Sequence, residues 1–179
     1  MLLITGDSYS GLKTPWTQQF NARVVGVPGW SNREIYYSLD SRASVALISL
    51  SSLHRLPFKI QTRQYDELNA SRNVTLSSNK RVYELNCYWA QRIIDEWAER
   101  SIIWSTFPDY ESWKSVLWIN LKQEDQMWDN VYTQTEKFVD HLTLLGNEQL
   151  YQLLVDELKT RKLWNQTYLR RANEQTTKR

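Results

Sequence analysis

A nearly unbroken apolar run at residues 45–50, Val-Ala-Leu-Ile-Ser-Leu, constrains the fold of this chain more than any other feature. A strand that is apolar on both faces must be covered on both sides, as happens in parallel sheets with helices above and below. Shorter runs of the same kind occur at 2–4, 23–27, 101–105 and 115–119. The sequence therefore predicts a mostly parallel sheet of about five strands.

Amphipathic segments separate these apolar runs. Residues 80–100 repeat apolar side chains every three or four positions, which predicts a long helix. A shorter helix is expected to begin near Arg33, capped by Ser31 or Asn32. A final helix is predicted over 144–158, and its inward-facing residues are Leu150, Leu153, Leu154 and Leu158. Strands that alternate with helices predict an α/β three-layer sandwich.

The length of the chain predicts a single domain. At 179 residues it is long enough for one buried core and too short for two ordinary domains. We predict one α/β domain over 1–165, interrupted by a polar insertion at about 55–79. Basic residues gather only in the last stretch, so 166–179 is interpreted as a basic, solvated tail.

Composition and charge exclude several classes of function. The net charge of +2 is small and the basic residues are scattered, so we expect no nucleic-acid partner. No apolar run reaches the length of a membrane span, and the amino terminus lacks signal-peptide features; both favour a cytoplasmic protein without a membrane partner. One cysteine and two histidines lack the usual zinc-ligand spacings, so neither a metal nor another cofactor is expected.

Segments that carry small or polar residues follow the first three predicted strands. They are Gly-Asp-Ser at 6–8, which contains Asp7 and Ser8, Gly-Trp-Ser-Asn at 29–32, which contains Gly29 and Trp30, and residues 49–55, which contain Ser51 and Arg55. The carboxyl ends of parallel strands meet at one edge of a sheet, where ligands bind in open α/β folds. His141 precedes the last helix and is expected to fold back over the same edge. A nucleophilic serine needs a base and donors for the developing oxyanion. His141 and the backbone amides of Ser8 and Gly29 are the candidates for these roles.

Three short motifs in the same order as the predicted elements resemble those of the SGNH/GDSL hydrolase superfamily. They are Gly-Asp-Ser-Tyr-Ser at 6–10, Val-Pro-Gly-Trp-Ser-Asn at 27–32 and His-Leu-Thr-Leu-Leu-Gly-Asn at 141–147. The resemblance implies a flavodoxin-like three-layer fold and an esterase or acyl hydrolase activity. It also implies roles for three residues, with Ser8 as nucleophile, Gly29 as an oxyanion donor and His141 as base.

The chain departs from the family pattern in its third block. The family has Gly-x-Asn-Asp there, and its Asn donates a further hydrogen bond to the oxyanion. Here the segment reads Ser-Leu-Ser-Ser-Leu-His-Arg at 49–55, and Ser51 or Ser52 stands near the place of that donor. A segment of this type with a following arginine resembles SGNH-like proteins of bacteriophages. Arg55 either binds an anionic group of the substrate or forms a supporting ion pair.

A second departure concerns the acid of the catalytic triad. The family pattern is Asp-x-x-His, but Phe138 stands three residues before His141. Glu136 and Asp140 remain as candidates for orienting the imidazole. Without either carboxylate, the resemblance implies a Ser–His dyad.

Two functional hypotheses follow. The first is a serine ester hydrolase that acts on a small ester or an acylated glycan, with Asp7 and Trp30 as supporting residues and Trp30 in the wall of the site. The second is a catalytically weakened SGNH-like domain with a binding or assembly role. Such a domain would have a protein partner, for example as an accessory, virion-associated phage protein.

Overall fold

The computed structural model describes most of the chain. For residues 128–132 and 138–141 it describes the backbone alone. The description covers 1–12, 14–57, 77–120, 128–132, 138–142 and 144–171. The predicted insertion at 55–79 therefore lies largely outside the described residues.

The core of the molecule is a five-stranded sheet in which every neighbouring pair runs parallel. Its spatial order is β2-β1-β3-β4-β5. The strands are β1 (Leu2–Gly6), β2 (Ala22–Val24), β3 (Val45–Ser49), β4 (Ser101–Ser105) and β5 (Leu117–Trp118). This is the flavodoxin-like doubly wound order, and it confirms the predicted α/β class.

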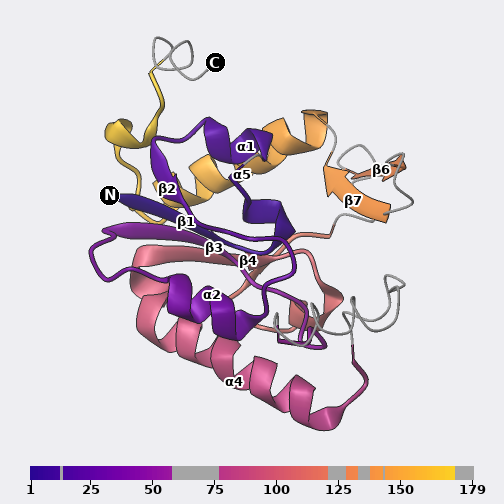
Figure 1. The fold of residues 1–179 in the computed structure, drawn as a ribbon. Helices are drawn as coiled ribbons and strands as arrows, with labels where there is room; N and C mark the ends of the chain where they lie inside the picture. Colours follow the sequence, from indigo (N-terminus) through magenta and orange to yellow (C-terminus); the bar gives the residue numbers. More distant parts are fainter. Residues whose placement is uncertain (13, 58–76, 121–127, 133–137, 143, 172–179) are drawn as a thin grey trace.

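Helices cover both faces of the sheet (Figure 1). On one face lie α1 (Pro15–Gln18) and α5 (Leu144–Thr160), and on the other lie α2 (Asn32–Ser38) and α4 (Lys80–Trp97). Alternate strand residues point to the two sides because successive side chains of a strand face opposite ways. The α5 side buries Leu2, Ile4, Leu47 and Trp104 with Leu150, Leu154 and Leu158; the α4 side buries Leu3, Ile48 and Ile103 with Ile35, Ala90 and Ile93.

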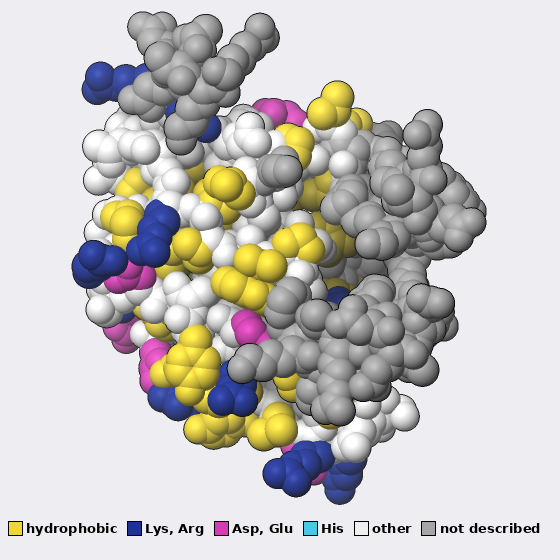
Figure 2. Space-filling model, in the orientation of Figure 1, with side chains coloured by type: hydrophobic (Ala, Val, Ile, Leu, Met, Phe, Trp, Pro, Cys, Tyr) yellow, Lys and Arg dark blue, Asp and Glu magenta, His cyan; other side chains and the backbone are white. Residues whose placement is uncertain are grey.

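Helix α4 shows why apolar periodicity alone did not identify its buried face. The helix begins after Asn79, whose side chain accepts a hydrogen bond from the backbone N–H of Arg81 at 2.8 Å. Its inward side chains are Asn86, Ala90, Ile93, Ile94 and Trp97. Leu85 and Tyr88, which belong to the same apolar pattern, are exposed on the outer side. Figure 2 shows hydrophobic side chains next to Lys and Arg over α2 and α4.

An antiparallel hairpin that the sequence did not predict precedes α5. It consists of β6 (Trp128–Tyr132) and β7 (Phe138–Leu142), with His141 opposite Asp129. In Figure 1 it lies on the side to which the carboxyl ends of the sheet strands point. His141 therefore belongs to a strand, three residues before the final helix begins.

The described part of the predicted tail packs onto the domain. The backbone N–H of Asn21 donates to the Tyr168 carbonyl at 2.7 Å, and the Tyr168 ring is buried against the core on the α5 side. None of the helices in the described ranges is both long and apolar enough to cross a bilayer.

Candidate functional site

Ser8 lies at the topological switch point of the sheet. Strand β1 stands between β2 and β3, so the chain leaves β1 toward one side and returns on the other. In sheets of this order, ligands bind outside the carboxyl ends of these central strands. Ser8 opens a short 3-10 turn, η1 (Ser8–Ser10), directly after β1. Its side chain is half-buried, and its hydroxyl has no hydrogen-bond partner within the described part of the chain.

A buried polar cluster holds the turn that carries Ser8. The Asp7 side chain is 2 % exposed and accepts hydrogen bonds from the Tyr9 backbone N–H and from the Ser49 hydroxyl, each at 3.1 Å. The Ser49 oxygen lies 2.7 Å from the Ser10 oxygen. Burial raises the pKa of Asp7 to about 6, although the Tyr9 N–H, the charge of Arg55 and the Ser49 hydroxyl all lower it. Asp7 thus fixes the Ser8 turn, and its pKa is about 6.

The Gly29 amide is presented by a tight turn over residues 27–30. The Trp30 N–H donates to the Val27 carbonyl at 3.2 Å, and Gly29, which follows a proline, has a φ of 87°. Proline then glycine with positive φ is the type II arrangement. The Val27 N–H donates to the Gly6 carbonyl at 3.1 Å, which ties this turn to the end of β1.

Trp30, predicted as a wall of the site, is half-buried and packs against the core on the α4 side. It directly follows Gly29, and the backbone of both residues belongs to the same turn.

Ser51 is fully buried in the loop that follows β3. Its backbone N–H donates to the Asn32 side chain at 2.9 Å, and the Tyr110 hydroxyl donates to its carbonyl at 2.5 Å. The Asn32 amide in turn donates to the Tyr110 oxygen at 2.9 Å. Arg55 Nε donates to the Ser51 hydroxyl at 3.3 Å, so Ser51 can still donate its own proton to another acceptor.

Two more side chains support the same loop. The Asn86 amide donates to the carbonyls of Leu53 and Arg55 at 2.9 and 2.8 Å. One carboxylate oxygen of Asp109 accepts from the Leu53 N–H at 3.0 Å and from the Ser52 hydroxyl at 3.1 Å. The sequence did not predict that these side chains support the loop that follows β3. They are Asn32, Asn86, Asp109 and Tyr110. Ser52 is thereby engaged with Asp109, which leaves Ser51 as the oxyanion candidate of the two.

The His141 segment is connected to the Ser8 turn by a chain of hydrogen bonds. The Asn147 amide donates to the Leu142 carbonyl at 3.2 Å, and its oxygen accepts from the Trp16 N–H at 3.3 Å. The Trp16 indole N–H donates to the Tyr9 carbonyl at 2.6 Å. The residues that follow His141 and Ser8 are therefore linked through two side chains.

The side chains proposed for base and acid lie outside the described residues. This holds for His141 and Asp140, whose backbone is described, and for Glu136. Within the described part of the chain, no three His, Cys, Asp or Glu side chains gather as metal ligands would.

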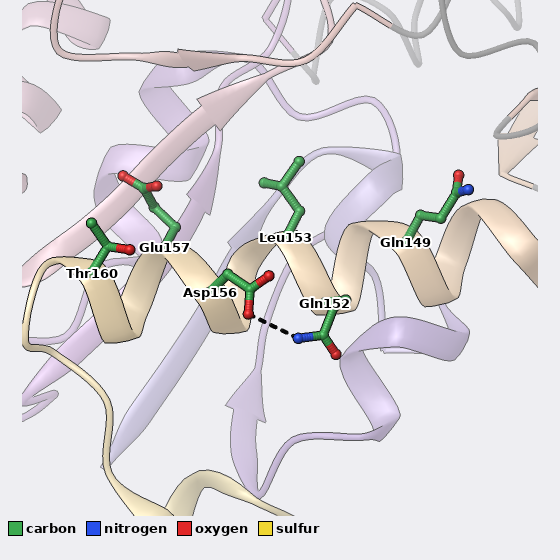
Figure 3. Close-up of a pocket in the computed structure, with 6 residues that line it drawn as sticks. All are labelled: Gln149, Gln152, Leu153, Asp156, Glu157 and Thr160. Atoms are coloured by element: carbon green, nitrogen blue, oxygen red, sulfur yellow. Dashed lines mark hydrogen bonds between the residues drawn. The ribbon is translucent and has the colours of Figure 1, made fainter.

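A surface hollow of about 450 Å³ lies elsewhere, along α5 (Figure 3). Its lining residues all belong to that helix: Gln149, Gln152, Leu153, Asp156, Glu157 and Thr160. Two of its polar groups bond to each other, since the Gln152 amide donates to Asp156 at 2.8 Å. None of the candidate catalytic residues lines this hollow.

No protein-family model matches the chain, and no curated protein matches it. What places this chain among known architectures is its five-stranded parallel sheet, in the order 2-1-3-4-5, flanked by helices.

Proposed function

We propose that this protein is a serine ester hydrolase of the SGNH type, with Ser8 as its nucleophile. One observation carries the proposal, the position of the half-buried Ser8 hydroxyl at the switch point of the sheet. The turn of Gly29 and the loop of Ser51 follow the strands on either side of β1. Oxyanion donors from several segments around one small nucleophile are what acyl transfer requires.

In the proposed reaction, His141 removes the proton from the Ser8 hydroxyl, whose oxygen then attacks the ester carbonyl. The amides of Ser8 and Gly29 and the hydroxyl of Ser51 donate hydrogen bonds to the oxyanion that forms. His141 returns the proton to the departing alcohol. It then activates a water molecule, which releases the acid from the acyl-enzyme. The hydrogen-bonded chain from Leu142 to Tyr9 supports this pairing of His141 with Ser8.

The proposed substrate is a small ester or an acylated glycan, above all an acetyl ester. The resemblance to the SGNH superfamily suggests this class. Fold alone does not determine a substrate, so assays with different acyl esters identify the acyl group.

Ser8→Ala is expected to reduce turnover at least about a thousandfold, since removing a nucleophile leaves only binding and oxyanion stabilisation. The assay compares 4-nitrophenyl acetate with an acetylated oligosaccharide. Ser112→Ala, at an exposed serine outside the three motifs, is the matched control and should keep wild-type rates. Wild-type protein that hydrolyses neither ester, or a Ser8→Ala variant that keeps its activity, would contradict the proposal. The first result would favour the binding or assembly hypothesis.

A further inference from the structure

The outer face of α4 carries a regular stripe of mostly exposed side chains. One of them, Arg92, contacts α2, because it donates to the Tyr36 hydroxyl at 2.6 Å, and it also donates to Glu96 at 3.0 Å. The stripe lies opposite the buried face of the helix, and its residues follow each other at alternating spacings of four and three. They are Arg81, Leu85, Tyr88, Arg92, Asp95 and Glu99, the last in the short turn η3 (Ala98–Arg100) that continues α4. This spacing is that of the contact seam in a coiled coil. Leu85 is 47 % and Tyr88 52 % exposed.

The charges of α4 run against its helix dipole. Lys80 and Arg81 occupy the first turn, which contains no acidic residue, while Asp95 and Glu96 stand in the last turn, which contains no basic one. Cations are favoured at helix C-termini and anions at N-termini, so this order destabilises an isolated helix. A second helix that runs antiparallel places the basic end of each beside the acidic end of the other.

Aromatic and arginine side chains flank the stripe on the side of α2. The Trp89 ring lies 5.1 Å from Tyr88 and 5.5 Å from Tyr37, which is 66 % exposed. The Arg33 guanidinium lies 5.9 Å from the centres of both the Tyr37 and Trp89 rings. Tyrosine, tryptophan and arginine are the residues enriched at protein interfaces.

We propose that the outer stripe of α4 binds a second copy of this chain, with the two α4 helices antiparallel about a two-fold axis near residue 90. Arg81 then lies opposite Glu99 of the second copy, Tyr88 lies opposite its Arg92, and Leu85 lies opposite its Asp95. The first is an ion pair and the second a cation–π pair. Each pair forms twice, because a two-fold interface uses the same patch on both partners.

The charge pattern favours a second copy over an unrelated protein. Both members of the Arg81–Glu99 and Tyr88–Arg92 pairs stand on the same stripe, so these two of the three pairs are complementary, whereas Leu85 opposite Asp95 is not. In an antiparallel coiled coil, an a position of one helix faces a d position of the other, and this register gives the same arrangement. The stripe faces away from the sheet, whereas Ser8 lies at its carboxyl edge. The inference is therefore independent of the proposed hydrolase function.

Sedimentation equilibrium of the full chain and its charge variants tests this interface. We expect the wild type to dimerise, and Arg81→Glu or Glu99→Arg to weaken the dimer at least about tenfold, because each reversal creates two like-charge contacts. The double variant Arg81→Glu with Glu99→Arg should recover the wild-type affinity. Arg171→Glu and Glu111→Arg, on exposed residues elsewhere, are the matched controls and should change nothing.

Two results would overturn the proposal. One is a wild-type chain that remains monomeric at high micromolar concentration. The other is a dimer that neither single reversal weakens, which would mean that a different surface joins the copies. Because the substituted side chains are exposed, circular dichroism should show the same fold for every variant.

Discussion

Gly6→Ala is expected to destabilise the fold by at least about 3 kcal/mol, the sum of backbone strain and overpacking. Gly6 has a φ of 148°, a conformation that residues with a Cβ rarely adopt. An added Cβ would lie 1.9 Å from the Ser49 hydroxyl oxygen and 2.6 Å from the Ser49 carbonyl oxygen. The second atom belongs to the backbone of β3, so no side-chain rotation relieves the contact. A loss of this size is a large part of the stability of an ordinary domain.

Gly11→Ala provides the matched control for this effect. A Cβ at Gly11 meets its nearest neighbour, the Thr14 hydroxyl oxygen, at 3.5 Å, which is ordinary contact. Its φ of −74° suits any residue, so alanine should be neutral or slightly stabilising there. The free energies of unfolding come from urea titrations of the three proteins. Equal stability of Gly6→Ala and Gly11→Ala would contradict the close approach of β1 to β3 at Ser49.

Asp7→Asn is expected to remove a pH dependence of stability. Burial raises the pKa of Asp7 from 3.8 to about 6 in the folded protein. The folded state therefore binds the proton more tightly than the unfolded state, and this contribution is complete below pH 3.8 and lost as the pH rises through about 6. The loss amounts to about 3 kcal/mol on the scale of 1.4 kcal/mol per pKa unit. The amide of Asn stays neutral, so the variant should show no such decline.

Urea titrations of the wild type and Asp7→Asn at a series of pH values between 4 and 7 measure this difference. Replacing the carboxyl by an amide also changes hydrogen bonds, which shifts the stability of the variant by a constant. The informative quantity is therefore the change with pH in the gap between the two proteins. A constant gap across the series would show that Asp7 is not a buried, titrating group.

The strands of the sheet could be predicted from the sequence because a buried strand consists of consecutive apolar residues, which can be recognised locally. Residues 45–50 and 101–105 predicted β3 and β4 almost to the residue, since both strands are buried along their whole length. The edge strand predicted at 115–119 is shorter in the structure, where β5 covers only Leu117–Trp118. Edge strands are half-exposed and have a weaker apolar signal.

The supports of the candidate site could not be predicted, because their partners are distant in sequence. Asn32 bonds Ser51 and Tyr110, which lie 19 and 78 positions away. Nothing in the local pattern distinguishes such an asparagine from a helix cap, which is how the sequence presented it. The positions of Ser8 and Gly29 could be predicted for the opposite reason, since each comes a few residues after a strand that the sequence did predict.

Peptide mapping after treatment with a fluorophosphonate tests the proposed role of Ser8 most directly. The reagent phosphonylates an activated serine and spares ordinary hydroxyls, so the expected result is one adduct per chain, on Ser8, near neutral pH. Ser8→Ala should remain unlabelled, although buried Ser10, Ser49 and Ser51 are all still present. An unlabelled wild type, or an adduct on any serine other than Ser8, would contradict the assignment of Ser8 as the nucleophile.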